Sequence, residues 1–373
     1  MIYLDSAATS YQKPRTVMQA VMRAMSNCAS PGRGSHEPAM RAADEVFEFR
    51  SIAADFFGMD SPENVILTMN ATHALNIALN SLVRAGDRVV ISGFEHNAVT
   101  RPLHALGARM DVIRTPLFDR EAILKGFENR IDGASCVVCT QVSNVFGYIL
   151  PIKEIAGLCR EAEVPLVVDA SQGAGILPLR MKELGAEFAA MPGHKGLLGP
   201  QGTGILLCRD SAVPLLYGGT GSGSTEQSMP DYLPDRLEAG THNVPGAAGL
   251  RAGLEAVRGM GLTRILAHER NLMRLMADRL NRISGLRVFL SEDPEAQCGV
   301  LSIFPMRCSC EALAEALGEH GIAVRAGLHC APLAHETAGT RETGTLRFSF
   351  SPFNTPGEVL RSAEITARIM SNM

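Results

Sequence analysis

The feature that most constrains the fold of this 373-residue chain is an alternation, from about residue 64, of short apolar segments with amphipathic ones. Strands are predicted at 64–68, 88–92, 110–114, 134–140 and 165–169, and helices at 71–82, after His96 and at 152–162. Near-continuous apolar strands separated by helices are typical of a buried, mainly parallel sheet. The pattern therefore predicts an α/β fold.

The pattern changes after about residue 248. Helices are predicted at 249–260, 262–284 and 309–321, and strands at 286–290, 299–304 and 323–325. This arrangement suits a smaller α+β domain, and the length of the chain favours two domains. We expect a large domain at 13–247 and a small domain formed by 1–12 with 248–373.

Composition excludes several classes of function. The net charge is −4 and no basic block stands out, which argues against nucleic acid and anionic membranes as partners. No apolar run is long enough to span a bilayer, and residues 1–5 lack the features of a signal peptide, so a cytoplasmic protein is expected.

The nine cysteines are scattered through apolar segments. Free cysteines in a cytosolic protein are mostly small buried hydrophobes. Cys136 and Cys139 lie three apart on a predicted strand, where they face opposite sides and share neither a metal ion nor a disulfide. Cys308 and Cys310 have no second pair to complete a zinc site. No metal is expected.

Polar residues follow the ends of several predicted strands, at 70–72, 95–96, 144, 169–172 and 194–195. Open sheets of this kind bind ligands beyond the carboxyl ends of their strands. We therefore expect these residues to converge on one site.

Lys195 is the most informative of them. It follows His194 in a segment with glycines at 193, 196, 199 and 202, and it lacks the charged neighbours of a surface lysine. Glycines let the backbone approach a ligand closely, and a lysine held away from water can act as an amine nucleophile. The alternative is a turn between two strands with a snorkelling lysine.

Asp169 ends an apolar strand, where an unpartnered carboxylate is costly, so a cationic partner is expected. The pyridinium nitrogen of pyridoxal phosphate is such a partner, and this pairing makes that cofactor an electron sink. The alternative is an aspartate that caps a turn. Gln172 would lie within reach of a cofactor hydroxyl.

Seven motifs carry a family resemblance. They are YLDSAA at 3–8, EHNA at 95–98, VSNVFG at 142–147, VDASQ at 168–172, GHKGLLGP at 193–200, EAGTHN at 238–243 and RAGLHC at 325–330. In this order the chain resembles the class V aminotransferase-like, fold type I pyridoxal-phosphate enzymes, specifically the cysteine desulfurase and selenocysteine lyase group. The resemblance implies a large domain with a mainly parallel seven-stranded sheet and a smaller α+β domain.

The resemblance also implies roles for residues around the cofactor ring. Lys195 would bond covalently to the cofactor aldehyde, Asp169 would keep the pyridine nitrogen protonated, and Gln172 would bind the ring hydroxyl. His96 would stack on the ring and assist proton transfer. Asn144 would contact both cofactor and substrate.

The cofactor phosphate would be held by Thr72, His194 and the backbone amides at the start of the helix that contains Ala71. Pro192 stands where many relatives have a phosphate-binding serine, and Ala71 where they have a threonine. His73 is a candidate compensating donor. In relatives the residue matching Thr241 reaches the phosphate of the neighbouring subunit, which implies a homodimer.

The substrate carboxylate would bind Asn144 and Arg347, the latter by a bidentate pair. The alternative for Arg347 is a strand arginine in a surface ion pair. Arg325 and His329 would complete the substrate side and would depress the pKa of the Cys330 thiol.

Cys330 distinguishes between reactions, because in desulfurases the cysteine here attacks the sulfur of the substrate and leaves as a persulfide. A buried structural cysteine is the alternative. Leu328 replaces a histidine common beside this cysteine. The short segment at 325–330 resembles desulfurases that pass the sulfur to an acceptor protein.

We therefore predict a pyridoxal-phosphate-dependent cysteine desulfurase, of the kind that supplies sulfur for iron-sulfur cluster assembly. The alternatives are a selenocysteine lyase, another class V reaction on the same cofactor, and a catalytically idle sulfur carrier or scaffold.

Overall fold

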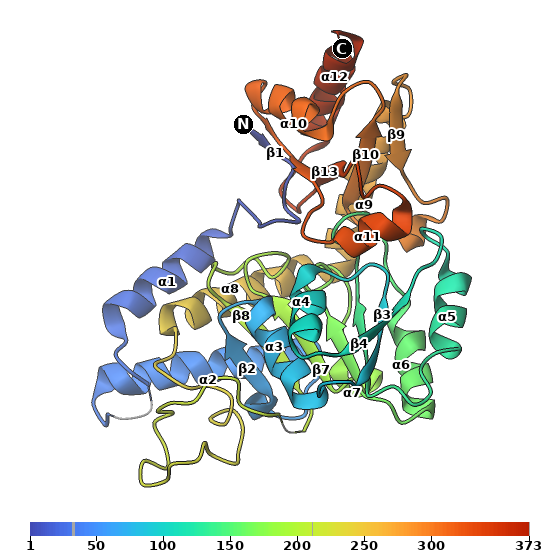
Figure 1. Cartoon of the computed structure of the whole chain (residues 1–373). Helices are drawn as coiled ribbons and strands as arrows, with labels where there is room; N and C mark the ends of the chain where they lie inside the picture. The colour runs from blue at the N-terminus through green and yellow to red at the C-terminus, as the bar shows by residue number, and fades with distance from the viewer. Residues whose placement is uncertain (32–33, 211, 373) are drawn as a thin grey trace.

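The chain folds around two main sheets, one in a lower body and one in an upper body (Figure 1). The structure, a computed structural model, describes residues 1–31, 34–210 and 212–372. In spatial order the lower sheet contains β2 (Val65–Thr68), β8 (Gly204–Cys208), β7 (Phe188–Pro192), β6 (Leu166–Asp169), β5 (Cys136–Thr140), β3 (Arg88–Ser92) and β4 (Arg109–Ile113). Only β8 runs antiparallel to its neighbours. The expected mainly parallel seven-stranded sheet is confirmed.

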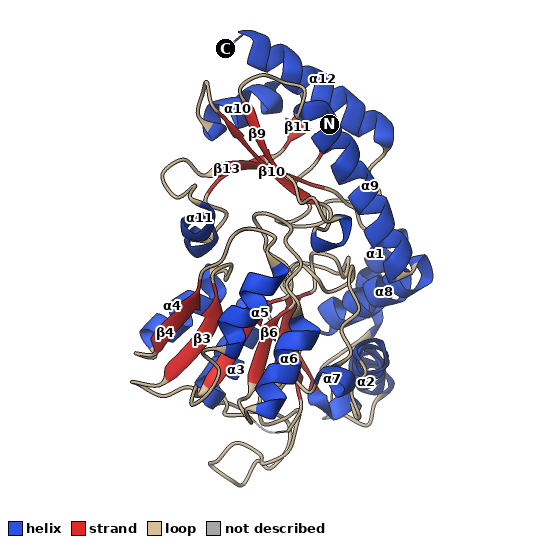
Figure 2. Ribbon diagram, turned by 90° about the vertical axis from the view of Figure 1, so that its right-hand side faces the viewer, coloured by secondary structure: helices blue, strands red, loops and turns tan. Residues whose placement is uncertain are grey.

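Helices cover both faces of the lower sheet (Figure 2). The core on one face includes α3 (Ala71–Leu82) and α4 (Asn97–Ala105), and the core on the other includes α1 (Arg15–Asn27), α2 (Glu37–Phe57), α5 (Arg120–Glu128), α6 (Ile152–Glu161) and α8 (Val244–Met260). Cys136 packs in the first core and Cys139 in the second, so the two thiols face opposite sides as expected. The short helix α7 (Met181–Leu184) precedes β7.

The upper body is built on an antiparallel sheet. Its order is β12 (Arg325–Gly327), β13 (Thr345–Ser349), β10 (Val300–Pro305) and β9 (Leu286–Phe289), and its core also includes α9 (Leu262–Leu280), α10 (Cys310–Glu319) and α12 (Pro356–Asn372). The short helix α11 (Pro332–Ala338) lies between β12 and β13 in the chain. This body is the smaller α+β unit expected after residue 248.

The N-terminal residues join the upper body. β1 (Ile2–Tyr3) pairs in parallel with β11 (Ile322–Ala323), and Leu4 packs in the upper core. The single strand expected at 323–325 is wrong, because Ala323 ends β11 and Arg325 begins β12 in a different sheet. β11 pairs with β1, whereas β12 is the edge strand of the upper sheet, so the chain passes from one sheet to the other between these two strands.

The domain boundary expected at residue 248 falls within α8. The buried side chains of α8, among them Val244, Leu250 and Leu254, pack in the core of the lower sheet. The division into 13–247 and 1–12 with 248–373 therefore stays a proposal, with α8 as the helix on which the two parts meet.

None of the helices in the described part of the chain is both long enough and apolar enough to traverse a lipid bilayer.

Candidate active site

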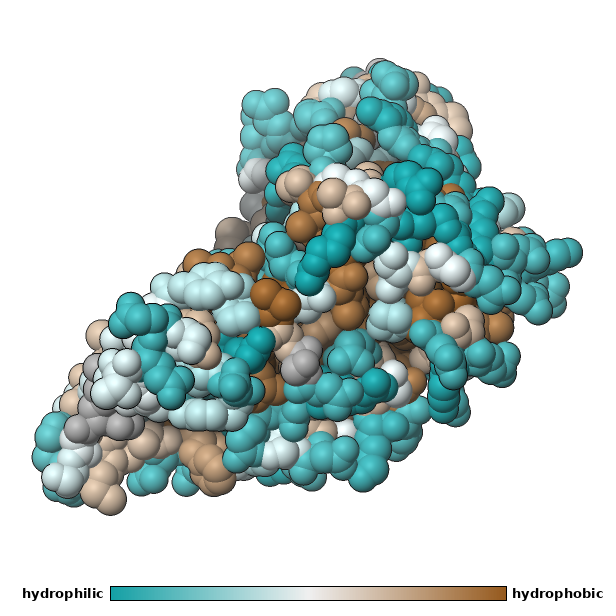
Figure 3. All heavy atoms as spheres, turned by 60° about the horizontal axis from the view of Figure 1, so that its bottom comes forward, coloured by the Kyte–Doolittle hydropathy of each residue, from teal (hydrophilic) through white to brown (hydrophobic). Residues whose placement is uncertain are grey.

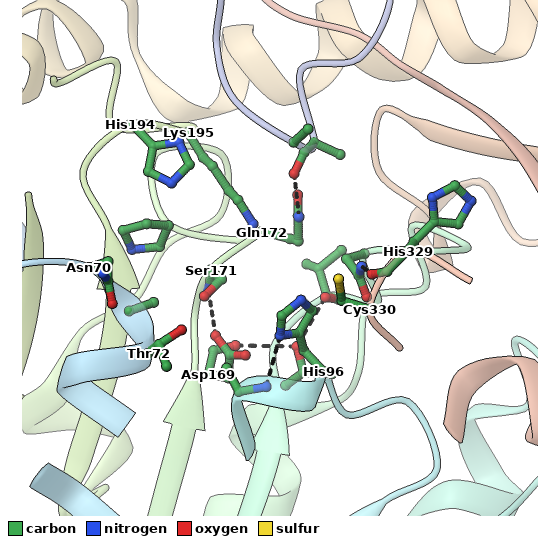
Figure 4. A pocket seen from close by; sticks show the side chains of 18 of the residues that line it. Asn70, Thr72, His96, Asp169, Ser171, Gln172, His194, Lys195, His329 and Cys330 are labelled. Atoms are coloured by element: carbon green, nitrogen blue, oxygen red, sulfur yellow. Dashed lines mark hydrogen bonds between the residues drawn. The ribbon is translucent and has the colours of Figure 1, made fainter. Parts of the chain in front are cut away.

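A cavity of about 240 Å³ lies at the carboxyl ends of the central strands (Figure 4). Thr140 ends β5, Asp169 ends β6 and Pro192 ends β7, and all three line it. The expected site residues that line it are Ala71, Thr72, His96, Asn144, Asp169, Gln172, His194, Lys195, Arg325, His329, Cys330 and Arg347. Segments far apart in sequence therefore converge on one site.

Lys195 lies in the loop between β7 and β8 with its side chain directed into the cavity (Figure 4). Enclosure by protein lowers the pKa of its amine to about 8, although the nearby Asp169 carboxylate opposes this shift. The surrounding glycines are needed for close packing: a Cβ at Gly193 would lie 2.1 Å from Thr203 Oγ1, and one at Gly199 2.6 Å from a Leu250 methyl. The loop therefore accepts no larger residue at either position.

Asp169 is 2% exposed and forms the floor of the cavity. Its Oδ1 accepts a 2.9 Å hydrogen bond from the Ser171 amide. The Gln172 side chain donates to the Ala7 carbonyl oxygen at 2.9 Å, which fixes the N-terminal segment over the cavity. Asp169 thus presents a negative charge to the cavity beside the Lys195 amine.

His96 caps the first turn of α4, because its Nδ1 accepts a 3.0 Å hydrogen bond from the Ala98 amide. Burial lowers the pKa of this imidazole to about 4, so the ring is neutral near pH 7 and carries its proton on Nε2. The adjacent Glu95 is fully buried and accepts a 2.8 Å hydrogen bond from the Thr140 amide. Burial raises the pKa of the Glu95 carboxyl to about 8.

The N-terminus of α3 opens on the cavity. Asn70 caps the His73 amide at 2.9 Å, and among the described residues the amides of Ala71 and Thr72 have no acceptor. Two free amides at a helix N-terminus favour an anion. His194 approaches with its Nδ1 3.0 Å from Thr9 Oγ1, and burial lowers the pKa of its ring to about 4.

Two expected residues do not line the cavity. The His73 ring accepts a 3.4 Å hydrogen bond from the Met69 amide, and its Nε2 is buried without a partner among the described residues. Thr241 is exposed on the loop that precedes α8. Neither side chain contributes to the cavity of its own chain.

The Cys330 loop is held from two sides. Asn144 Nδ2 donates to the His329 carbonyl oxygen at 2.7 Å, and the Asn97 amide donates to the Cys330 carbonyl oxygen at 2.8 Å. His329 and Cys330 have φ angles of 50° and 55°, a left-handed conformation that is costly for residues other than glycine. The exposed Cys330 thiol is thereby directed to the cavity (Figure 4).

His329 differs from its expected role as a positive neighbour of Cys330. Burial, reinforced by the Arg347 charge, lowers the pKa of its ring to about 2, and its Nε2 lies 3.1 Å from the Thr345 carbonyl oxygen. The ring is therefore neutral near pH 7. Of the two expected cations, Arg325 alone carries a charge.

Arg347 is 2% exposed and lies opposite Arg325 on the neighbouring strand. It pairs with the Asp5 carboxylate at 2.9 Å and donates to the Asn144 carbonyl oxygen at 2.8 Å, while its Nε has no partner among the described residues. The ion pair is therefore buried, not at the surface. Opposite residues on antiparallel strands share a face, so both guanidinium groups point to the cavity.

Several residues at the site were not predicted. Ala7 and Ala8 line the cavity from the N-terminal segment, Thr140 lines it from the sheet edge, and Asp5 neutralises Arg347. Thr140 ends β5, and this position at a strand end is the signal that could have identified it. Ser171, from the expected group at 169–172, also lines the cavity. No local pattern marks Asp5 as a partner for a residue more than 300 positions later.

Comparison with known proteins identifies the family. The family model for class-V aminotransferases matches residues 2–361. A probable cysteine desulfurase of Methanothermobacter thermautotrophicus is 32% identical over 371 residues, covering 96% of this chain and 92% of its own. One of Pyrococcus abyssi is 31% identical, covering 96% and 92%.

A solved structure shows the same likeness. The apo cysteine desulfurase of Thermococcus onnurineus NA1 has a TM-score of 0.91 and 30% identity, covering 100% of this chain and 95% of its own. The chain belongs to the class-V aminotransferase family, and its relatives there are cysteine desulfurases.

Proposed function

We propose that this chain is a pyridoxal-phosphate-dependent cysteine desulfurase that converts L-cysteine to L-alanine and retains the sulfur as a persulfide on Cys330. One observation carries the proposal: the exposed Cys330 thiol lines the same cavity as the Lys195 amine and the Asp169 carboxylate. A cysteine thiol is a strong nucleophile, so the cavity holds a group that can take sulfur from a substrate bound beside Lys195.

The cavity fits the cofactor. Asp169 offers a buried carboxylate for a pyridinium nitrogen, and the amides of Ala71 and Thr72 offer donors for a phosphate. Lys195 is the amine that would bind the aldehyde. When bound, pyridoxal phosphate supplies an electron sink for carbanion chemistry.

Pro192 at the cavity wall removes one side-chain donor that relatives use. His194 and Thr72 would take its place beside the phosphate, and His96 would lie against the cofactor ring. We expect the phosphate to depend mainly on the start of α3, because its amides point to the cavity.

Substrate recognition would use Arg347, Asn144 and Arg325. Among the described residues the Nε of Arg347 has no acceptor, and the group lies within a buried ion pair, so a substrate carboxylate can complete its hydrogen bonding. The Arg347–Asp5 pair also fixes the guanidinium plane. Arg325 is exposed and adds a second positive charge at the mouth.

Two side chains, those of Lys195 and Cys330, would carry the reaction. The Lys195 amine has a pKa of about 8, so a usable fraction is unprotonated near neutral pH and can accept the proton from the substrate Cα. The Cys330 Sγ then attacks the substrate sulfur. An S–S bond forms as the C–S bond of the substrate breaks, and Cβ receives the electron pair of that bond together with a proton equivalent to the one lost by the Cys330 thiol. The products are a persulfide on Cys330 and alanine.

A homodimer is part of the proposal. On α1 the side chains of Met18, Met22 and Met25 are 57–70% exposed and recur at helical spacing on one face. α1 and α2 lie at the left in Figure 1. The face drawn in Figure 3 mixes hydrophobic residues with hydrophilic ones. An exposed apolar stripe of this kind favours a protein interface. Thr241, outside its own cavity, would reach the cavity of the second copy.

Sulfur transfer to an acceptor protein is supported by the exposure of Cys330, because a persulfide there is open to attack from solvent. A cytoplasmic location is supported by the free thiols, since that compartment keeps cysteines reduced.

The test is mass spectrometry of the purified chain, loaded with pyridoxal phosphate, after incubation with L-cysteine. A mass increase of one sulfur on Cys330, absent in Cys330→Ala although that variant still binds the cofactor, is the expected result. Undiminished sulfide release by Cys330→Ala would contradict the assignment. Rates on L-cysteine and L-selenocysteine measured side by side separate this activity from a selenocysteine lyase.

A further inference from the structure

A second, smaller cavity of about 30 Å³ lies behind the catalytic lysine, and we call it the rear chamber. Ala7, Gln172 and Lys195 line both this chamber and the main cavity. Its remaining walls include Ser6 from the N-terminal segment and Glu269 from α9. Ser10, Ser349 and Ser351 also line it, so the chamber places several polar side chains at the back of Lys195.

The carboxyl group of Glu269 is buried, and no described residue pairs with it. Its side chain is 3% exposed, and the hydrogen bonds and ion pairs of the described residues include none to its carboxyl group. A Cβ at Gly299 would lie 3.0 Å from Glu269 Oε2, so the carboxyl group packs on a bare stretch of backbone. A buried carboxyl group with no ion pair is rare in proteins.

The hydroxyl group of Ser6 is a second buried polar group without a partner. Its Oγ has no hydrogen-bond partner among the described residues. A buried polar atom left unsatisfied costs roughly 1–3 kcal/mol, so most such atoms bind ordered water. A polar cavity needs roughly 10–15 Å³ of accessible volume to hold one water molecule, and the rear chamber exceeds that.

We propose that Glu269 and Ser6 hold ordered water in the rear chamber, and that Glu269 exchanges a proton with the Lys195 amine through that water. The chamber water would bridge the two groups, since Lys195 and Glu269 both line the chamber. The inference rests on the proposed function, because it supplies a proton partner for the lysine that function requires.

The charges around Glu269 support the exchange. Burial raises the pKa of its carboxyl well above the ordinary value, so it is protonated near pH 7, whereas the pKa of Lys195 is lowered to about 8. Cys298, the other titratable group in the chamber, stays neutral because burial raises its pKa to about 12. Arg270 points elsewhere, to the Gln297 carbonyl oxygen and to Glu295.

The proton balance closes within the chamber. Glu269 gives its proton to the water while the water gives one to Lys195 Nζ, and the reverse step restores both groups. The intermediate arrangement is a carboxylate facing an ammonium group, which attract each other at low dielectric. Glu269 would therefore act as a positioning residue that works through water on Lys195.

The first experiment uses the chain without cofactor and compares wild type, Glu269→Gln and Glu269→Leu by infrared spectroscopy at neutral pH. Glu95 is also protonated near pH 7, so its carboxylic acid band should be present in all of these proteins. The wild-type-minus-variant difference spectrum should contain a second carboxylic acid band that shifts in D₂O, for both Glu269 variants. Asp278→Asn, at an exposed position on the same helix, is the matched control and should give no such band in its difference spectrum. Difference spectra of both Glu269 variants without this band would overturn the proposal.

The second experiment uses the chain loaded with pyridoxal phosphate and measures exchange of the α-hydrogen of L-alanine with D₂O. Glu269→Leu should slow exchange roughly tenfold, the equivalent of one pKa unit, and Ser6→Ala should slow it less. Glu269→Gln keeps the shape of the side chain but has no carboxyl proton. It should therefore also exchange the α-hydrogen slowly, although it unfolds at the same temperature as wild type.

Unchanged exchange in both Glu269 variants would overturn the relay. A chain that shows the carboxylic acid band and proton exchange but forms no persulfide would contradict the proposed function and leave the rear chamber assignment standing.

Discussion

Asn144 Nδ2 donates a 2.7 Å hydrogen bond to the carbonyl oxygen of His329, the residue that precedes Cys330. The bond joins the loop after β5 in the lower body to the Cys330 loop in the upper body. The Asn97 amide makes the second such link, to the Cys330 carbonyl oxygen. These contacts stabilise a backbone conformation that the Cys330 loop would not adopt alone, since both His329 and Cys330 have positive φ.

Asn144→Ala should weaken this link. The buried His329 carbonyl oxygen would lose its donor, so we expect the free energy of unfolding to fall by roughly 1–3 kcal/mol and persulfide formation to slow. Urea unfolding and single-turnover kinetics measure the two effects. Asn97→Ala keeps its backbone amide and is the control; an equal loss in both variants would refute a specific role for the Asn144 side chain.

The left-handed conformation of Cys330 predicts a difference between two substitutions. Cys330→Gly should be more stable to unfolding than Cys330→Ala, because only glycine adopts φ near 55° without steric cost. Both variants lack the thiol, so the difference between their free energies of unfolding reports the backbone strain at this position. We expect relief of strain to stabilise the glycine variant by about 1 kcal/mol, and the larger entropy that glycine loses on folding offsets part of this gain. Alanine as stable as glycine would mean that the loop is unstrained.

The lowered pKa of Lys195 predicts a pH dependence in the chain without cofactor. The amine is the reactive form, so the rate at which Lys195 bonds to pyridoxal phosphate should rise with pH and level off above about pH 8. Stopped-flow absorbance across pH 6–10 measures this rate, and Lys195→Ala gives the background. A rate that still rises steeply at pH 10, as expected for the ordinary lysine pKa of 10.5, would show that the amine is not perturbed.

Glu95 predicts a pH dependence of stability. Its pKa is about 8 when folded and near the ordinary 4.5 when unfolded, so the folded state binds the extra proton between these values. The stabilisation is fully present below about pH 4.5 and is lost as pH rises to about 8. The free energy of unfolding of the wild type should therefore decrease over this range. In Glu95→Gln this decrease should be smaller by a few kcal/mol, measured by urea unfolding at successive pH values. A parallel pH profile in both proteins would contradict a protonated Glu95.

Local patterns predicted most of the lower sheet correctly. β3 and α3 have the expected bounds, and β2, β4, β5 and β6 differ from expectation by one or two residues at an end. Continuous apolar segments leave few alternatives for a buried strand, which explains this accuracy. The helices α1 and α2, whose apolar residues contact α8, were not predicted.

The candidate site was predictable where a residue follows a strand. Asp169, Lys195 and His96 fall at strand ends, and a parallel sheet gathers its carboxyl ends at one edge. Thr241 was expected from the family pattern and His73 as a compensating donor, and neither lines the cavity of its own chain. The neutral His329 was not predictable, because its pKa depends on burial that no sequence neighbour reveals.

The sequence by itself determined the sheet, the residues at its carboxyl edge and the family, because each depends on local periodicity or on short motifs. Only the tertiary structure decided that Asp5 pairs with Arg347, that Asn144 and Asn97 hold the Cys330 loop, and that Glu269 and Lys195 line one chamber. Each of these arrangements joins residues far apart in the chain. Their charges and strain arise from burial, which exists only once both bodies have packed together.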